Sequence, residues 1–216
     1  MLSFIKVESF KLSKKLKSWL GPLLVMILVL IAFPLSIDIS QYDLDKFYFS
    51  IIVVSLLMTA FVATEGMFEE DFEDGSLEQE FLKEKDFYKL VISKIFVYVC
   101  LIGIPIAFIG ALFSFANGVA IGSFGRVFLL LSLSNLLLFN LFAFGNALSI
   151  NKGAMLGVLS SLPLALPVII LLGRAIRSIQ YGDGFFAVTT LMVGIGLMVS
   201  AIMPLIISAA LKTHID

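Results

Sequence analysis

Residues 65–90 read EGMFEEDFEDGSLEQEFLKEKDFYKL. This acidic segment holds ten of the sixteen acidic residues of the chain and lies between two long apolar runs. Nearly all of the remaining sequence is suited to lipid, so the acidic segment is where the chain can meet a water-soluble partner.

The composition around the segment is that of a membrane protein. Hydrophobic residues make up 60% of the 216 positions and charged residues 14%, whereas an ordinary soluble domain is about 25% charged. The apolar runs are roughly 20 residues long, enough to cross a bilayer as helices. A single cysteine, Cys100, excludes an internal disulfide and a cysteine-based metal cluster. The net charge of −1 gives no indication of nucleic-acid binding.

The hydrophobic pattern predicts an all-α integral membrane protein with six transmembrane helices. It divides the chain into an amphipathic segment (1–18), a membrane domain (19–211) that contains a polar coupling segment (67–88), and a short tail (212–216). We expect the six helices at about 19–37, 48–66, 89–115, 124–148, 154–173 and 187–211.

The first 19 residues predict a helix that lies in the membrane interface. Lysines crowd this segment, and their stems can reach lipid head groups from one side of the helix. A charged flank of the first span is the alternative, and the residue pattern leaves both open. On a helical wheel, the apolar side of this helix would consist of Leu2, Ile5, Leu12, Leu16 and Trp19.

The distribution of basic residues predicts the orientation. With the N-terminus inside, an even number of spans puts both termini and the acidic segment in the cytoplasm. The inner side then holds eleven basic residues and the outer side four. The inner set is Lys6, Lys11, Lys14, Lys15, Lys17, Lys83, Lys85, Lys89, Lys94, Lys152 and Lys212, and the outer set is Lys46, Arg126, Arg174 and Arg177.

Small and polar residues inside the spans predict how the helices pack. Stripes such as Gly103 with Ala107 and Ala111, Gly118 with Gly122, and Gly153 with Gly157 would let helices approach closely. Three asparagines in the fourth span are expected to hydrogen-bond between helices. They are Asn135, Asn140 and Asn146.

The sequence offers little chemistry of its own. It has no G-x-x-x-x-G-K-[ST] loop for a nucleotide, no carboxylate in the middle of a span, and a single histidine, His214, in the tail. We therefore expect a non-catalytic subunit without a metal or cofactor. Arg174 and Arg177 are three residues apart and form a candidate pair for a carboxylate ligand, although snorkelling to lipid phosphates is the explanation that the sequence favours.

The acidic segment itself predicts a turn followed by a short helix. Asp74-Gly75 is a turn signal, and Ser76 with Gln79 fits a capping box at the start of a helix that runs from Leu77 to about Lys85. Such a helix could receive a push from a soluble motor, or it could be a solvated loop that tucks against the bilayer. The candidate docking residues are Asp74, Gly75, Ser76, Leu77, Glu78, Gln79 and Phe81, with Leu77 and Phe81 on one apolar face.

Three motifs resemble the CcmB family, the membrane subunit of the cytochrome c maturation ABC exporter. The first is Glu65, Phe68 and Asp71 followed by the element DGSLEQ at residues 74–79. The others are FPLSI at residues 33–37 and LPL at residues 162–164 with Pro167. The length and the six-span layout agree as well, so the resemblance covers essentially the whole chain.

The resemblance implies an ABC-exporter permease in the bacterial inner membrane that couples ATP hydrolysis on a partner to haem export or to release of a haem-loaded chaperone. The implied partners are the ATPase CcmA, the subunits CcmC and CcmD, the haem chaperone CcmE and a second copy of this chain. ATP would bind the partner, and haem would be a substrate. Two alternatives stay open: a permease that exports a lipid or polysaccharide, and a non-transporting scaffold in the haem-handling complex.

Overall fold

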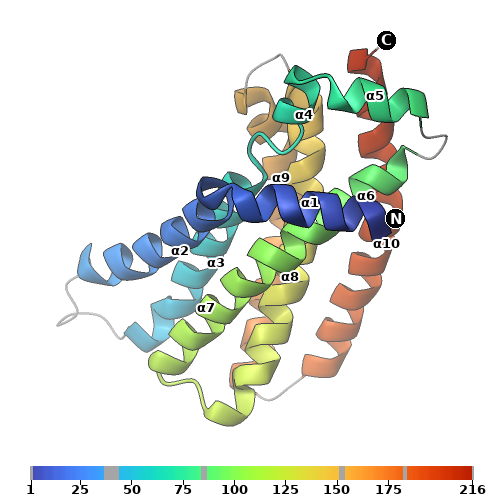
Figure 1. Ribbon diagram of the computed structural model, residues 1–216. Coiled ribbons are helices and arrows are strands. Elements are labelled where there is room, and N and C mark those ends of the chain that lie inside the picture. Colours follow the sequence, from blue (N-terminus) through green and yellow to red (C-terminus); the bar gives the residue numbers. More distant parts are fainter. Residues whose placement is uncertain (1, 37–43, 84–86, 151–153, 182–183, 216) are drawn as a thin grey trace.

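The computed structural model describes residues 2–36, 44–83, 87–150, 154–181 and 184–215, and these residues form helices joined by short turns (Figure 1). Six stretches of them are long and apolar enough to cross a membrane. The predicted class, an all-α membrane protein with six spans, is confirmed.

The spans follow one another along the chain with short connections. The first two are α2 (Leu16–Ser36) and α3 (Leu44–Thr64). The third consists of α6 (Tyr88–Tyr98), the π-helical turn η1 (Val99–Gly103) and α7 (Ile104–Ala116). The last three are α8 (Ile121–Ser149), α9 (Ala154–Tyr181) and α10 (Phe185–Ile215). Three further helices lie outside the spans: α1 (Leu2–Lys14), α4 (Glu69–Glu73) and α5 (Ser76–Lys83).

One predicted boundary is wrong. The fifth span was expected to end at residue 173, but α9 continues to Tyr181. The apolar run does end before Arg174, but arginine is a good helix former, so the helix continues past the point where the hydropathy falls. Arg174 and Arg177 therefore lie on a helix, as their candidate role requires.

The central element is α8, which contacts α3, α7, α9 and α10 and carries the most buried of the six apolar stretches. α1 lies across the bundle, while α4 and α5 cover one of its ends (Figure 1). The described ends of the chain lie toward this same end (Figure 1).

α1 is a helix separate from the first span, as the interfacial interpretation requires. Leu12 is buried against the bundle, and Ile5 and Trp19 are half-buried, as the apolar face predicted. The side chains of Leu2 and Leu16 lie outside the described residues. Val7 and Phe10 are exposed on the opposite side of α1, so this helix presents apolar groups outward as well as inward.

Glycine lets α8 and α9 touch at their backbones. A Cβ placed on Gly145 would come within 2.5 Å of the Gly157 carbonyl oxygen, and one on Gly157 within 2.8 Å of the Gly145 carbonyl oxygen. The close approach predicted for Gly157 is confirmed, while Gly153 lies outside the described residues. The prediction for Gly118 and Gly122 is wrong, because both face open space.

The three asparagines of α8 have different roles. Asn135 donates from Nδ2 to the Gly103 carbonyl of η1 at 2.7 Å, an interhelical bond as predicted. Asn146 accepts from the Phe68 backbone N–H at 3.1 Å. Asn140 instead donates to the Leu136 carbonyl of its own helix, so the interhelical bond predicted for that donor is wrong.

Candidate functional site: the acidic segment and the charged junction beneath it

The acidic segment folds into two short helices at one end of the bundle. Positive φ angles at Gly66 (67°) and Gly75 (71°) turn the chain before α4 and before α5, a backbone region that glycine enters without steric strain. The turn predicted at Asp74-Gly75 and the helix predicted after it are both present, with α5 at Ser76–Lys83.

The start of α5 is capped differently from the prediction. Asp74 accepts from the Ser76 backbone N–H at 2.8 Å, and hydrogen bonds from Ser76 hold the pKa of the Asp74 carboxyl below its usual value. The Ser76 hydroxyl donates to the Asp71 carbonyl at 3.2 Å, and the Gln79 N–H bonds the Gly75 carbonyl. The expected capping box is therefore wrong, because the nearer Asp74 carboxylate takes the capping role.

The apolar face of α5 points into the protein. Leu77 is 1% exposed and packs in a cluster with Phe68, Phe87 and Leu90. Phe81 is half-buried, and its ring lies edge-on to Phe87 with the centroids 5.9 Å apart. The prediction that Leu77 projects toward a partner is wrong, because the bundle itself provides the apolar surface that covers it. Phe81 is only partly covered, and its docking role stays a prediction.

The outward face of α5 is mainly polar. Glu78 and Gln79 are exposed, and Leu82 is 84% exposed, the most exposed large apolar residue described. Asp74 is also exposed, and Gly75 and Ser76 are half-exposed at the start of the helix. Leu77 is the buried member of the predicted docking set. The other six residues, Asp74, Gly75, Ser76, Glu78, Gln79 and Phe81, are at least partly exposed to a partner.

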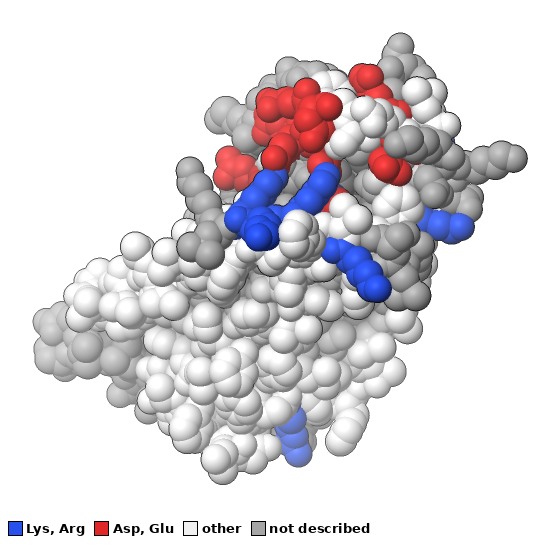
Figure 2. Space-filling model, viewed as in Figure 1, with Lys and Arg blue, Asp and Glu red and all other residues white. Residues whose placement is uncertain are grey.

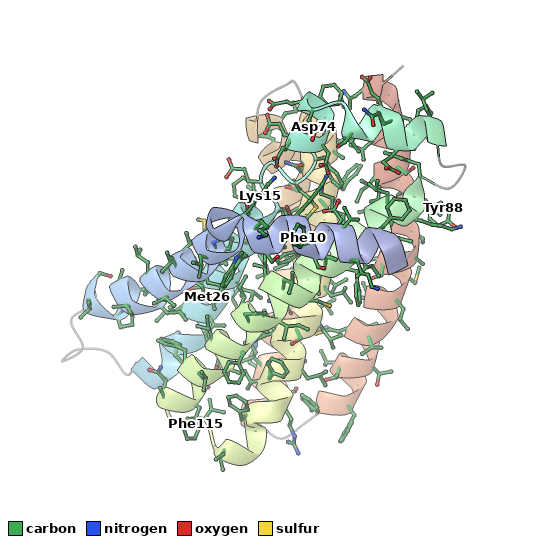
Figure 3. The ribbon with its side chains drawn as sticks, in the orientation of Figure 1. Phe10, Lys15, Met26, Asp74, Tyr88 and Phe115 are labelled. Atoms are coloured by element: carbon green, nitrogen blue, oxygen red, sulfur yellow. The ribbon has the colours of Figure 1, made fainter. Side chains whose placement is uncertain are left out.

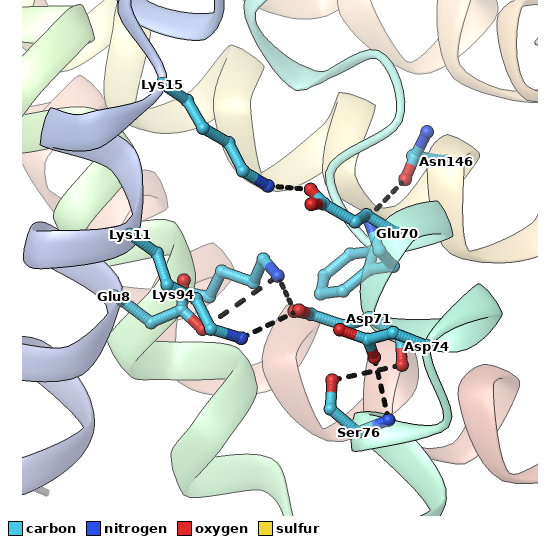
Figure 4. A network of polar contacts seen from close by, with 10 residues as sticks. Glu8, Lys11, Lys15, Glu70, Asp71, Asp74, Ser76, Lys94 and Asn146 are labelled. Carbon is cyan, nitrogen blue, oxygen red and sulfur yellow. Dashed lines mark hydrogen bonds and ion pairs between the residues drawn. The ribbon is translucent and has the colours of Figure 1, made fainter.

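Beneath α4 lies a group of four charges that we name the charged junction: Glu8, Lys11, Asp71 and Lys94 (Figure 4). The Asp71 carboxylate accepts from Lys11 of α1 at 3.0 Å through Oδ1 and from Lys94 of α6 through Oδ2. Lys94 also lies 3.9 Å from Glu8 Oε1. One carboxylate on α4 thus binds two other helices.

The charged junction is largely removed from water. Glu8 and Asp71 are each 7% exposed and Lys94 is 4% exposed. Lys94 Nζ lies 5.6 Å from the centroid of the Phe68 ring, which covers it from a further side. The side chain of Lys11 is 41% exposed, so this lysine pairs with the buried Asp71 from the edge of the junction. The junction as a whole has two carboxylates and two ammonium groups, which balance in charge.

The two carboxylates of the junction differ electrostatically. Burial raises the pKa of Glu8 more than the nearby Lys94 charge lowers it. For Lys11, loss of hydration alone would lower the pKa, but the hydrogen bond and charge of Asp71 reverse this and raise it. Asp71 is therefore the carboxylate of the junction that is hydrogen-bonded to a lysine, whereas the pKa of Glu8 is set chiefly by its burial.

A cavity of about 240 Å³ borders the junction between α1 and the end of α3. Its wall includes Lys15 of the α1–α2 connection and Glu70 of α4, which form an ion pair at the rim (Figure 4). In Figure 3, Lys15 and Asp74 lie toward the same end of the bundle, and Phe115 lies toward the opposite end. The three lysines that line this cavity, Lys11, Lys15 and Lys94, each form an ion pair with a carboxylate.

A family model described as CcmB protein matches residues 5–214 of the chain. The chain belongs to the CcmB protein family. It is similar to Heme exporter protein B of Haemophilus influenzae, with 28% identity over 221 residues that cover 100% of this chain and 98% of the relative. Heme exporter protein B of Pseudomonas aeruginosa is 30% identical over 164 residues, covering 75% and 74% of the two chains. That of Escherichia coli K12 is 33% identical over 86 residues, covering 40% and 39%.

The candidate arginine pair of this CcmB-family chain lies far from the acidic segment. α8 and α9 meet at Gly145 and Gly157, near the acidic end, and Arg174 and Arg177 are more than four turns further along α9. Both are exposed, and Arg177 Nε donates to the Gly173 carbonyl at 3.3 Å. A ligand role for them stays a prediction.

The charged junction of this CcmB-family chain was not predicted from its sequence. Two signals pointed to it: Glu8 is the lone acid among the N-terminal lysines, and Lys94 lies inside the predicted third span. A charge within a span needs a partner. The sequence could not supply that partner's identity, because residues 8, 71 and 94 meet only in the fold.

Proposed function

We propose that this CcmB-family protein is the permease subunit of a haem-exporter ABC transporter that serves cytochrome c maturation. The observation that carries the proposal is the acidic segment: a folded two-helix unit bound to one end of a six-span bundle, with Glu78, Gln79 and Leu82 facing outward. A helix held in this way can receive force from a soluble motor and pass it to the spans. Similarity to proteins named Heme exporter protein B, which for the Haemophilus influenzae protein extends over the full chain, supports the same function.

The motor in this proposal is the ATPase subunit CcmA, and the chain itself is non-catalytic. CcmA docks on the outward face of α5, and the sequence of this chain contains no nucleotide-binding loop of its own. CcmC, CcmD, the haem chaperone CcmE and a second copy of the chain complete the assembly. Haem is the substrate of the assembly, and ATP binds the partner.

The proposed location is the bacterial inner membrane with both termini and the acidic segment in the cytoplasm. The bias of eleven basic residues to four supports this orientation. Charged side chains of both signs gather at the α1, α4 and α5 end of the visible face, and a broad uncharged band separates them from the other end (Figure 2). The band is what lipid would cover.

Affinity purification of the tagged chain, expressed with the other subunits of the maturation system, tests the proposal. We expect CcmA and the haem chaperone to co-purify. Recovery of a different ATPase, without the chaperone, would favour a lipid or polysaccharide exporter instead. Haem transfer in reconstituted vesicles then separates transport from a scaffold role, since a scaffold would retain both partners and show no ATP-dependent haem movement.

A further inference from the structure

A continuous series of hydrogen bonds connects the docking helix to the third span. Ser76, the first residue of α5, donates through its hydroxyl to the Asp71 carbonyl at 3.2 Å. The Asp71 side chain in turn accepts from Lys94 of α6. Asp71 thus connects the surface helix α5 to the membrane-spanning helix α6 through two hydrogen bonds, one at its carbonyl and one at its side chain.

The Asp71–Lys94 pair is better suited to carry movement than the apolar contacts around it. Apolar contact is non-directional, so packed helices can slide past one another. A charge-assisted hydrogen bond has a preferred length and direction, and burial of both partners keeps water from replacing it. The second oxygen of Asp71 bonds Lys11, so α1 moves with the same unit.

The third span is irregular immediately beyond Lys94. The π-helical turn η1 begins at Val99, five residues after Lys94, and Pro105 follows it in α7. The Gly103 carbonyl at the end of η1 is held by Asn135 of α8. α7 is therefore anchored to the central helix, while α6 is joined to it through a turn in which the regular hydrogen-bond ladder is interrupted.

We propose that Asp71 and Lys94 are positioning residues that transmit movement of the docking helix to the third span, with η1 as the joint between its moving and anchored parts. This inference rests on the proposed function, because it needs a motor on α5. Neither residue contacts the motor in this arrangement. Their role is to keep α4, α5 and α6 moving as one body.

The test is the double variant Asp71→Asn/Lys94→Met in the complex with its ATPase. Removing both charges leaves no unpaired partner between them, and Glu8 with Lys11 remain as opposite charges on α1. Three quantities are measured: ATPase subunit retained, ATP hydrolysed, and covalent haem in a cytochrome c reporter. We expect normal retention and hydrolysis, with the haem yield per ATP hydrolysed falling about five- to tenfold.

Glu70→Gln is the matched control. It breaks the Lys15–Glu70 pair, which also connects α4 to the N-terminal region. The Glu70 side chain is 62% exposed and, within the part of the chain that the structure describes, forms no bond to the third span. We expect the yield per ATP to stay unchanged. The single variant Lys94→Arg keeps the ion pair and should retain most of the coupling that the double variant loses.

The outcomes separate the two proposals. The haem yield per ATP hydrolysed does not depend on the amount of complex that survives. A double variant with a normal haem yield per ATP would therefore overturn the inference, even if its abundance were low. Loss of ATPase retention would overturn it too, because the pair would then build the dock rather than transmit from it. Absence of any ATPase on the wild-type chain would instead overturn the proposed function.

Discussion

Asp71 is the residue through which three helices are connected. Its carboxylate bonds lysines of α1 and α6, and its carbonyl accepts from the first residue of α5. Glu8, 3.9 Å from the same Lys94, is equally buried but has no hydrogen bond to it. Removal of the charge should therefore cost stability at Asp71 and not at Glu8.

Asp71→Asn removes the hydrogen-bonded carboxylate partner of the buried Lys94 and leaves it only the Glu8 carboxylate at 3.9 Å, so we expect a loss of about 3 kcal/mol in unfolding free energy. Glu8→Gln removes a carboxylate whose ionisation is opposed by burial, so we expect no loss at neutral pH. Thermal unfolding of the purified variants in one detergent compares them. Equal destabilisation by both substitutions would contradict the distinction.

The raised pKa of Glu8 also sets the sign of a pH effect. The folded state binds this proton more tightly than the unfolded chain, so protonation of Glu8 adds stability as the pH falls through the raised pKa. The contribution is absent at higher pH. Glu8→Gln should flatten this part of the stability profile, and a profile that it leaves unchanged would assign the effect to another group.

At the scale of elements, α5 has an inner face that builds the fold and an outer face that is free. Hydrophobic periodicity located the helix but could not show which side faces the bundle, because an apolar stripe fits a partner protein and the chain's own core alike. The spans were predictable because hydropathy is a local property of the sequence. The charged junction was not, because its members are up to 86 residues apart.

Substitutions on the two faces of α5 should have different effects, one on ATPase binding and one on the abundance of the folded protein. Leu82→Asp changes an exposed side chain, so we expect normal abundance with reduced ATPase retention, measured on the purified complex. Leu77→Asp buries a carboxylate among apolar groups, so the folded protein itself should fall in abundance. Normal ATPase retention by Leu82→Asp would place the dock on another surface.

The contact between α8 and α9 gives a second test at this scale. Gly145→Ala places a Cβ against the Gly157 carbonyl, and we expect a loss of about 1–3 kcal/mol in unfolding free energy from overpacking. Gly125→Ala in the same helix meets open space, so it should be neutral or stabilising by up to about 1 kcal/mol. A chemical unfolding series in mixed micelles compares the pair.

At the scale of the whole molecule, the charges are separated toward two ends of an apolar bundle. The acidic segment, α1 and the C-terminal part of α10 share one end, and the turn between α7 and α8 lies at the other (Figure 1). The arrangement itself fixes which segments share a side. The excess of lysine then decides which side is cytoplasmic.

Single cysteines at Glu78 and Ala120, both exposed, test this orientation in a Cys100→Ser background. A membrane-impermeant thiol reagent added to intact cells should label the cysteine at position 120 and reach the one at position 78 only after the membrane is opened. Labelling of both positions in intact cells would contradict the six-span arrangement.

The charged junction also imposes an order on biosynthesis. Glu8 leaves the ribosome 86 residues before Lys94, roughly 4–17 s earlier at ordinary rates of synthesis. Asp71 follows Glu8 by 63 residues and Lys94 follows by 86, so α1 lacks the complete junction and must wait at the membrane surface until the third span has been made. A cysteine in place of Leu12, which is buried in the finished protein, should become protected only in nascent chains that extend beyond Lys94. The first helix to be synthesised can thus take its final place only after the third span has been made.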